Sequence, residues 1–129
     1  MTIAAGKAAA RSYFEEVLNR GDMAVADAIF APGVRFQYPL GDLNGLPAVK
    51  NYIAAVREAF PDITFAVEDL FGEGDQVAAR WSLAGTQTGR FRGKPPTGKR
   101  VAVAGNTVFR LQNGRIDEMW VAFDPARLA

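Results

Sequence analysis

The spacing of apolar residues changes once along this chain, near residue 62, and this change constrains the fold more than any other feature. Before it, apolar residues recur at helical spacing, and the first such segment runs from a cap at Thr2 to about residue 19. After it they alternate, as in Ile63, Phe65 and Val67. Helices first and strands later predict an α+β protein with a mostly antiparallel sheet.

Turn residues mark the limits of the predicted elements. Gly21 and Asp22 separate the first helix from a short second helix, which Pro32 and Gly33 end, and Pro47 opens a third. The predicted strands are residues 34–38, an alternating run from residue 63 to 68, 77–86, 101–111 and 115–124, with a hairpin at Asn113-Gly114. No repeat or linker interrupts the pattern, so residues 1–129 are predicted to form a single domain.

The composition excludes several kinds of active site. The 129 residues include no cysteine and no histidine, which rules out disulfides, thiolate metal sites and nucleophiles activated by histidine. No acidic run has the spacing of a calcium loop, so we expect no bound metal. Acid–base chemistry would have to use a carboxylate, a tyrosine, a lysine or water.

The charge pattern gives no reason to expect nucleic acid or membrane as a partner. The net charge is +1 and the apolar stretches are short, so we predict no membrane span, and the N-terminus lacks a signal-like segment, so we expect a cytoplasmic location. Five basic residues do cluster in the segment 87–100, where they could attract an anionic substrate or simply form a solvated loop at a pocket mouth. They are Arg90, Arg92, Lys94, Lys99 and Arg100.

A series of short turn motifs gives the chain its resemblance to a known family. In order, they are Asn19-Arg20-Gly21-Asp22, Phe30-Ala31-Pro32-Gly33-Val34, Phe60-Pro61-Asp62, Gly74-Asp75-Gln76-Val77, Gly85-Thr86-Gln87-Thr88-Gly89, Pro95-Pro96-Thr97-Gly98-Lys99 and Asn113-Gly114-Arg115-Ile116, with Glu118, Trp120 and Asp124 after them. In this order and spacing the chain resembles the SnoaL-like polyketide cyclases of the nuclear transport factor 2-like superfamily. The resemblance implies a cone-shaped, barrel-like fold, in which three helices lie in a strongly curved sheet around a deep apolar pocket.

The same resemblance implies a function that needs no cofactor. Similar proteins close a polyketide ring by an intramolecular aldol reaction, in which a carboxylate removes a proton from carbon and a polar group stabilises the enolate. We therefore expect a cyclase, isomerase or lyase that acts on a small hydrophobic carbonyl compound. The alternative is a protein of the same fold that binds a small molecule, or only forms a structural dimer, without chemistry.

Two carboxylates on the last strand are the candidate catalytic residues. A strict alternation of two places Glu118, Trp120 and Asp124 on one face, where burial beside the indole would raise the pKa of a carboxylate. In similar proteins an aspartate in this region is the acid–base group, and Asp124 is the nearest match, followed by Glu118. The alternative for Asp124 is a solvent-exposed position that caps a terminal turn ahead of Pro125.

Seven further residues are candidates for contact with a substrate, and each also has a purely structural interpretation. The aromatic candidates, which are equally at home in a core, are Phe14, Tyr38, Tyr52, Trp81 and Trp120. Gln87 stands where many similar proteins carry the histidine of Gly-Thr-His-x-Gly, and it is otherwise a loop residue without a role. Asn106 could donate to an enolate oxygen, or it could mark a bulge after Gly105.

The opposite face of the last strand motivates a prediction about assembly. Alternation places Met119, Val121 and Phe123 together, facing away from the expected pocket. A monomer would expose this apolar patch to water, so we expect a homodimer formed through the outer face of the sheet.

Overall fold

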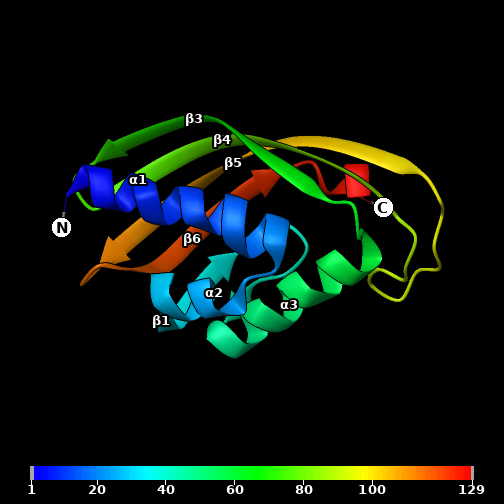
Figure 1. Ribbon diagram of the computed structural model, residues 1–129, viewed down its shortest axis with the longest axis horizontal. Helices are drawn as coiled ribbons and strands as arrows, with labels where there is room; N and C mark the ends of the chain where they lie inside the picture. The colour runs from blue at the N-terminus through cyan, green and yellow to red at the C-terminus, as the bar shows by residue number, and fades with distance from the viewer. Residues whose placement is uncertain (1, 129) are drawn as a thin grey trace.

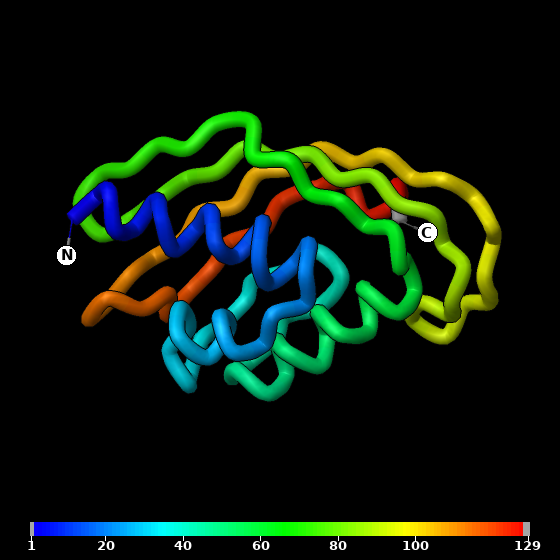
Figure 2. Tube along the Cα trace, in the orientation of Figure 1, coloured from blue at the N-terminus to red at the C-terminus, as the bar shows by residue number. Residues whose placement is uncertain are grey.

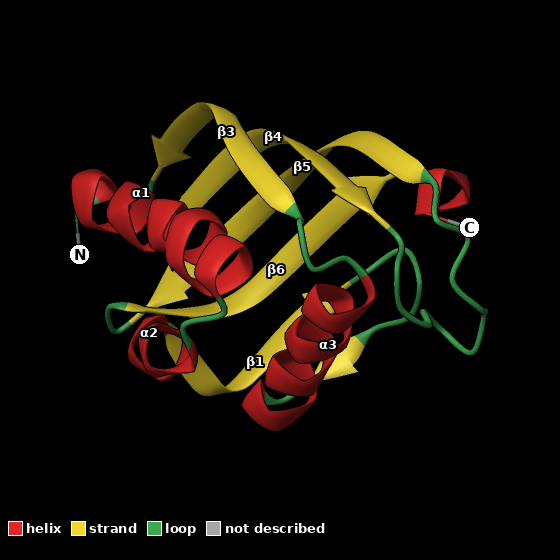
Figure 3. Cartoon of the chain, turned by 45° about the vertical axis from the view of Figure 1, so that its right-hand side comes forward, coloured by secondary structure: helices red, strands yellow, loops and turns green. Residues whose placement is uncertain are grey.

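The computed structural model describes residues 2–128, which form a six-stranded sheet with helices in its concave side (Figures 1 and 3). The strand order is β2-β1-β6-β5-β4-β3, and every pair is antiparallel except β1 with β6. The predicted α+β arrangement with a mostly antiparallel, curved sheet is confirmed. The sheet bends around the helices without closing, since β2 and β3 remain its two edges.

The helices begin and end close to where the sequence predicts. They are α1 (Ile3–Ser12), the π-helical segment η1 (Tyr13–Leu18) that continues it, α2 (Met23–Ile29), α3 (Leu46–Ala59) and the 3-10 turn η2 (Pro125–Leu128). The side chain of Thr2 accepts a hydrogen bond from the amide of Ala5, and that of Asp22 accepts from the amide of Val25, as expected for N-caps. No helix of the described residues is long and apolar enough to cross a membrane.

The last three strands agree with the predicted ones, whereas β1 starts earlier, β3 extends five residues beyond the predicted residue 68, and β2 lies in a segment predicted to be a loop. They are β1 (Phe30–Gln37), β2 (Leu43–Asn44), β3 (Thr64–Glu73), β4 (Gln76–Thr86), β5 (Arg100–Gln112) and β6 (Arg115–Phe123). β1 starts four residues before the predicted Val34, because Phe30 already pairs with Ile116 of β6. The predicted hairpin is confirmed, since Asn113 and Gly114 both have positive φ angles, 53° and 78°.

Besides a shift in the β1–β6 pairing between Phe30 and Arg35, two irregularities interrupt the antiparallel pairing of the long strands. One lies between Val67 and Asp69 of β3, and the other lies in β6, where Asp117 is an extra residue between the pairs Leu111–Ile116 and Arg110–Glu118. Such bulges increase the bend of a sheet and reverse the faces on which the following side chains lie. The second bulge therefore decides which residues of β6 face the helices.

The helices bury a continuous aromatic core against the concave face of the sheet. Tyr13 lies at its centre, and its ring centroid is 5.1–6.1 Å from those of Phe14, Phe30, Phe36 and Phe109. The contacts of Tyr13 with Phe30, Phe36 and Phe109 are edge-to-face, a geometry that adds roughly 0.5–1.5 kcal/mol per pair beyond the burial of apolar area. This packing fixes η1 against β1 and β5.

Asp62 joins the end of α3 to the end of β4. Its carboxylate accepts hydrogen bonds from the amide of Thr86 at 2.7 Å and from the Thr86 hydroxyl at 2.9 Å. These hydrogen bonds, with a smaller contribution from Arg100, hold the pKa of Asp62 below its usual value. Asp62 thus positions the start of the loop 87–99, which follows Thr86.

The lowered pKa of Asp62 leads to a prediction about stability and pH. A carboxyl whose pKa is lower in the folded state stabilises the fold above its unfolded value of about 4, and this contribution disappears as the pH falls through the folded pKa. We expect Asp62→Ala to have a lower Tm than the wild type at pH 7, and the difference to narrow below about pH 4. Thermal unfolding followed by circular dichroism at both pH values measures this. A difference in Tm that is the same at pH 7 and pH 3 would contradict it.

Candidate functional site

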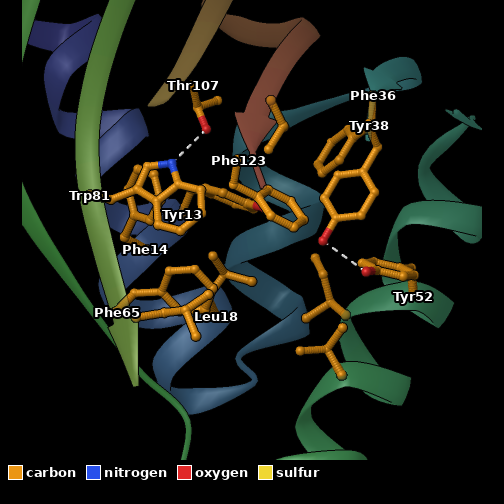
Figure 4. Close-up of a pocket in the computed structure, with 14 residues that line it drawn as sticks. Tyr13, Phe14, Leu18, Phe36, Tyr38, Tyr52, Phe65, Trp81, Thr107 and Phe123 are labelled. Atoms are coloured by element: carbon orange, nitrogen blue, oxygen red, sulfur yellow. Dashed lines mark hydrogen bonds between the residues drawn. The ribbon is translucent and has the colours of Figure 1, made fainter. Parts of the chain in front are cut away.

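A narrow cavity lies between the helices and the concave face of the sheet (Figure 4). Its volume is about 40 Å³, enough for a few water molecules and far below the roughly 300–1,000 Å³ of typical ligand pockets. Fourteen residues line it, contributed by η1, β1, α3 and β3 to β6 and by the turn after β1. They are Tyr13, Phe14, Leu18, Phe36, Tyr38, Tyr52, Ile53, Val56, Phe65, Trp81, Leu83, Thr107, Val121 and Phe123.

Two tyrosine hydroxyls meet at one side of this cavity. Tyr52 on α3 and Tyr38 share a hydrogen bond of 2.8 Å between their hydroxyls, which leaves the second proton of the pair free for another acceptor (Figure 4). Tyr38 directly follows β1, and a tight turn holds it, because its amide donates to Asp42 and its carbonyl accepts from the amide of Gly41. Both rings are only partly buried, so this pair lies where the cavity approaches the surface.

A second polar pair lies on the sheet. Trp81 at the centre of β4 donates its indole N–H to the hydroxyl of Thr107 on β5 at 2.9 Å (Figure 4). The indole has room only because its partner on β5 is Gly105, where an added Cβ would lie 2.5 Å from the ring. Thr107 is 2 % exposed, and since it accepts from the indole its own proton is free.

Tyr13 brings a third phenol to the cavity from η1. Its side chain is 6 % exposed, and neither of the two hydrogen bonds drawn among the lining residues in Figure 4 involves it. Within residues 2–128 no side-chain oxygen or nitrogen that is sealed from solvent lacks a partner. The Tyr13 hydroxyl is therefore not sealed but borders the cavity, where an entering oxygen atom can accept its proton.

The lining carries hydroxyl groups but no charge. None of the fourteen lining residues is Asp, Glu, Lys or Arg. Burial raises the pKa of Tyr13, Tyr38 and Tyr52 above the usual value of a phenol, because the charged phenolate would lose its hydration. At neutral pH the three tyrosines are thus hydrogen-bond donors rather than bases.

The structure brings four of the predicted residues together around this cavity. Phe14, Tyr38, Tyr52 and Trp81 all line it. Gln87 lies elsewhere, buried inside the loop 87–99, where its amide donates to the carbonyls of Gly89 and Pro95 and accepts from Thr97.

The predicted faces of the last strand are wrong beyond residue 117. Because Asp117 is an extra residue in the pairing of β6, the alternation shifts by one, and Val121 and Phe123 point into the cavity. Glu118 and Trp120 consequently lie on the convex face, outside the cavity lining. Met119 is fully buried.

Each of the remaining candidates has a clear structural position away from the cavity. Glu118 accepts from Gln37 at 2.6 Å and pairs with Arg110 at 3.2 Å, and Arg110 in turn lies 6.0 Å from the centre of the Trp120 ring. Asp124 is exposed and accepts from the amide of Ala126, which is the capping alternative. Asn106 is exposed and pairs with Ala122 on the convex face. Neither Asp124 nor Asn106 lines the cavity.

The inward direction of Val121 and Phe123 also removes the motive for the predicted dimer. The apolar patch expected on the outer face is part of the interior instead. Dimerisation stays a prediction, and it would have to use other residues of the convex face. Exposed Phe71 on β3, which is 63 % exposed, belongs to that face through its pairing with Ala78.

Sequence reasoning missed two groups of lining residues. Tyr13 could have been found, since it lies three residues after Ala10 and four before Val17 on the predicted inner face of the first helix. Val121 and Phe123 could not have been found by alternation, because the sequence has no specific signal for the bulge at Asp117. It shows only two consecutive acidic residues, Asp117 and Glu118, before an apolar segment.

Comparison with known proteins agrees with this architecture. The family model described as "SnoaL-like polyketide cyclase" matches residues 8–129. The chain belongs to this family. The match confirms the predicted resemblance. No curated protein sequence matches the chain.

Solved structures of the family superpose over nearly the whole chain. A SnoaL-like polyketide cyclase candidate from Jannaschia sp. CCS1 has a TM-score of 0.90 and 28 % identity, covering 99 % of this chain and 92 % of its own. AclR from Streptomyces galilaeus, described as a candidate hydroxylase, has a TM-score of 0.83 and 26 % identity over 98 % and 80 % of the two chains. IdmH from Streptomyces antibioticus, a candidate polyketide cyclase, has a TM-score of 0.80 and 27 % identity over 95 % and 96 %.

The close approach of Gly105 to the indole predicts a strongly destabilising substitution. A Cβ at residue 105 would meet Trp81 at 2.5 Å and the carbonyl oxygen of Ala122 at 2.6 Å, and the backbone cannot move aside cheaply. We expect Gly105→Ala to lose about 2–3 kcal/mol of unfolding free energy in urea denaturation. Gly33→Ala is the matched control, since no atom lies within 4 Å of its added Cβ. Equal stability of the two variants would contradict the packing described here.

The contacts of Glu118 predict a structural rather than a chemical effect. Glu118→Ala would leave Arg110 and Gln37 without this partner on a buried part of the sheet, and we expect a loss of about 1–3 kcal/mol. Exposed Glu15, paired only with Arg11, is the control, and Glu15→Ala should cost at most about 0.5 kcal/mol. Both are measured by urea denaturation. A Glu118→Ala protein as stable as the wild type would refute this role.

Proposed function

We propose that the chain binds a hydrophobic carbonyl compound in the tyrosine-lined cavity and promotes a cofactor-free cyclisation of the kind its family name describes. The observation that carries the proposal is the cavity lining itself, which is apolar and aromatic with hydroxyl donors at separate points. Such a lining favours a ligand whose body is apolar and whose oxygen atoms only accept hydrogen bonds.

The hydroxyl groups supply the chemistry. In an intramolecular aldol reaction, the carbon of an enol attacks a carbonyl carbon, a C–C bond forms, and the electron pair of the C=O bond moves to its oxygen. The free proton of the Tyr38–Tyr52 pair and the hydroxyl of Tyr13 are donors that can stabilise this developing negative charge. The proton leaves the enol oxygen and reaches the new alkoxide through water, so the product has the same atoms as the substrate.

Positioning is the second contribution. The walls formed by Phe14, Trp81 and Phe123 can hold a flexible chain folded so that its two reacting carbons are close. Restricting a chain in this way can remove several kcal/mol from the barrier of a ring closure. The proposal therefore does not use the carboxylates of Asp124 and Glu118, since neither lines the cavity.

A ligand requires the cavity to open. The volume of about 40 Å³ cannot hold even a single aromatic ring system, so side chains at the surface side must rotate. Tyr52 and Val56 on α3 are only partly buried, which makes them the side chains with freedom to move. Their rotation separates the Tyr38–Tyr52 hydroxyl pair and exposes both donors to the ligand.

The proposal predicts a preference for carbonyl compounds that depends on Tyr38. Fluorenone and fluorene differ only by C=O against CH₂, so the change in the ratio of their affinities between wild type and Tyr38→Phe, measured by equilibrium dialysis, reports the hydrogen bond to Tyr38. We expect fluorenone to bind more tightly than fluorene, and Tyr38→Phe to lower that ratio about fivefold to tenfold. A ratio unchanged in Tyr38→Phe would exclude the hydroxyl from ligand recognition.

Two controls locate the ligand and test for chemistry. In a Trp120→Phe protein Trp81 is the only tryptophan, and fluorenone bound in the cavity must quench its fluorescence. A hydrophobic 1,5-diketone that closes to a six-membered aldol product tests turnover, which should be slower in Tyr38→Phe. If no such compound is bound, the proposed function is wrong.

A binding protein without catalysis is the second candidate. It is favoured by the lack of any acidic or basic side chain among the fourteen lining residues, because proton removal from carbon usually needs a positioned base. Tight binding of fluorenone together with unaccelerated closure of 1,5-diketones would support this function over the first.

A further inference from the structure

We propose that Arg92 recognises a carboxylate group carried by the hydrophobic ligand, at the mouth of the cavity. This inference rests on the proposed function and narrows its ligand to an amphiphilic compound, with an apolar carbonyl-bearing body and an anionic end. The placement of the loop 87–99, the unpaired charge of Arg92 and the uncharged lining of the cavity support it.

The loop 87–99 is held in one conformation by buried contacts. Gln87 at its start is 5 % exposed and bonds to the carbonyls of Gly89 and Pro95 and to the hydroxyl of Thr97. Backbone hydrogen bonds between Gln87 and Lys99 and between Gly98 and Gln87 close the base of the loop. The backbone of the loop therefore has a defined conformation, although its basic side chains are exposed to solvent.

The tip of the loop is anchored to the helix that forms one wall of the cavity. Phe91 is 6 % exposed and packs edge-to-face on Phe60, with ring centroids 5.4 Å apart. Phe60 directly follows α3, one turn beyond Val56, which lines the cavity. The carbonyl of Ala59 also accepts from the amides of Thr88 and Gly89. Figure 2 shows the loop beside the last turn of α3.

A two-residue turn fixes the position of Arg92 on the loop. The φ angles of Arg92 and Gly93 are 52° and 77°, close to the 53° and 78° of the Asn113-Gly114 turn, and the backbones of Phe91 and Lys94 exchange two hydrogen bonds across the turn. Arg92 directly follows the anchored Phe91, so its backbone is held beside the end of α3.

The charge of Arg92 is not neutralised by the protein. Within residues 2–128 the ion pairs do not include Arg90, Arg92, Lys94 or Lys99, and in this basic segment only Arg100 approaches a carboxylate, that of Asp62 at 4.0 Å. Arg90 is committed to the carbonyl of Gly93. Arg92 thus has a free guanidinium, the group best suited to bind a carboxylate through two parallel hydrogen bonds.

Arg92 also lies within electrostatic reach of the two hydroxyls at the mouth. Burial raises the pKa of Tyr38 and of Tyr52, and the positive charge of Arg92 lowers it in both, against the effect of burial. The positive charge of Arg92 is therefore near enough to the hydroxyl pair to act on both phenols. A ligand whose carbonyl oxygen meets Tyr38 would extend its outer end toward Arg92.

The charge-free lining explains why an anionic end would stay at the mouth. A carboxylate inside the cavity would lose its hydration without meeting any positive group, which is strongly unfavourable. At the mouth it keeps contact with water and gains Arg92. The uncharged cavity and the positive charge at its mouth therefore orient the ligand with its apolar end inside the cavity.

The test compares an acid with its neutral ester. The probes are fluorenone-2-carboxylic acid and its methyl ester, and their affinities at low salt are measured by equilibrium dialysis with the wild type, Arg92→Gln and Lys99→Gln. Lys99→Gln removes the same charge from the same loop and is the matched control. We expect the wild type to prefer the acid, Arg92→Gln to weaken the acid about tenfold with little effect on the ester, and Lys99→Gln to change both by less than about twofold.

Other outcomes contradict the proposal in distinguishable ways. Equal affinity of the wild type for acid and ester, or equal effects of Arg92→Gln and Lys99→Gln, would show that Arg92 has no specific role while leaving the proposed function intact. If neither probe binds, both the proposed function and this inference are wrong.

Discussion

The contact of Arg110 with Asp117 and Glu118 lies at the bulge that decides which residues of β6 face the cavity. Its guanidinium donates to Asp117 at 3.0 and 3.2 Å and pairs with Glu118 at 3.2 Å, all on the convex face of the sheet. Two neighbouring residues can share one face of a strand only if the pairing admits an extra residue, which is the bulge at Asp117. Beyond it Val121 and Phe123 turn toward the helices and complete the cavity wall.

Much of the fold follows from features that the sequence displays locally. These features depend only on residues that are close in the sequence, so they can be recognised without a structure. They are the caps Thr2 and Asp22, the turn at Asn113-Gly114 and the change from helical to alternating spacing. The site depends instead on contacts between distant residues. The parallel pairing of β1 with β6 and the Arg110 contacts at the bulge join segments far apart, and no local pattern announces them.

Membership of the family does not identify the reaction, but the lining of the cavity limits the kinds of reaction that the protein can promote. Structures about equally similar to this chain include candidate cyclases and a candidate hydroxylase, so the shared architecture supports more than one chemistry. The cavity of this chain has a set of protonated phenols in an uncharged, mostly aromatic enclosure. That environment suits the stabilisation of charge that appears on a substrate oxygen more than the removal of a proton by the protein.

The hydrogen bond between Tyr52 and Tyr38 has a kinetic consequence. In the opening motion proposed above, only the fraction of molecules in which this pair is broken can bind a ligand. The apparent affinity of every ligand is then reduced by that fraction, and its rate of association reaches a ceiling at high concentration, set by the frequency of opening. The Tyr38 hydroxyl then has two roles in the proposed function, since it takes part in the hydrogen bond that limits entry and also recognises the ligand's oxygen.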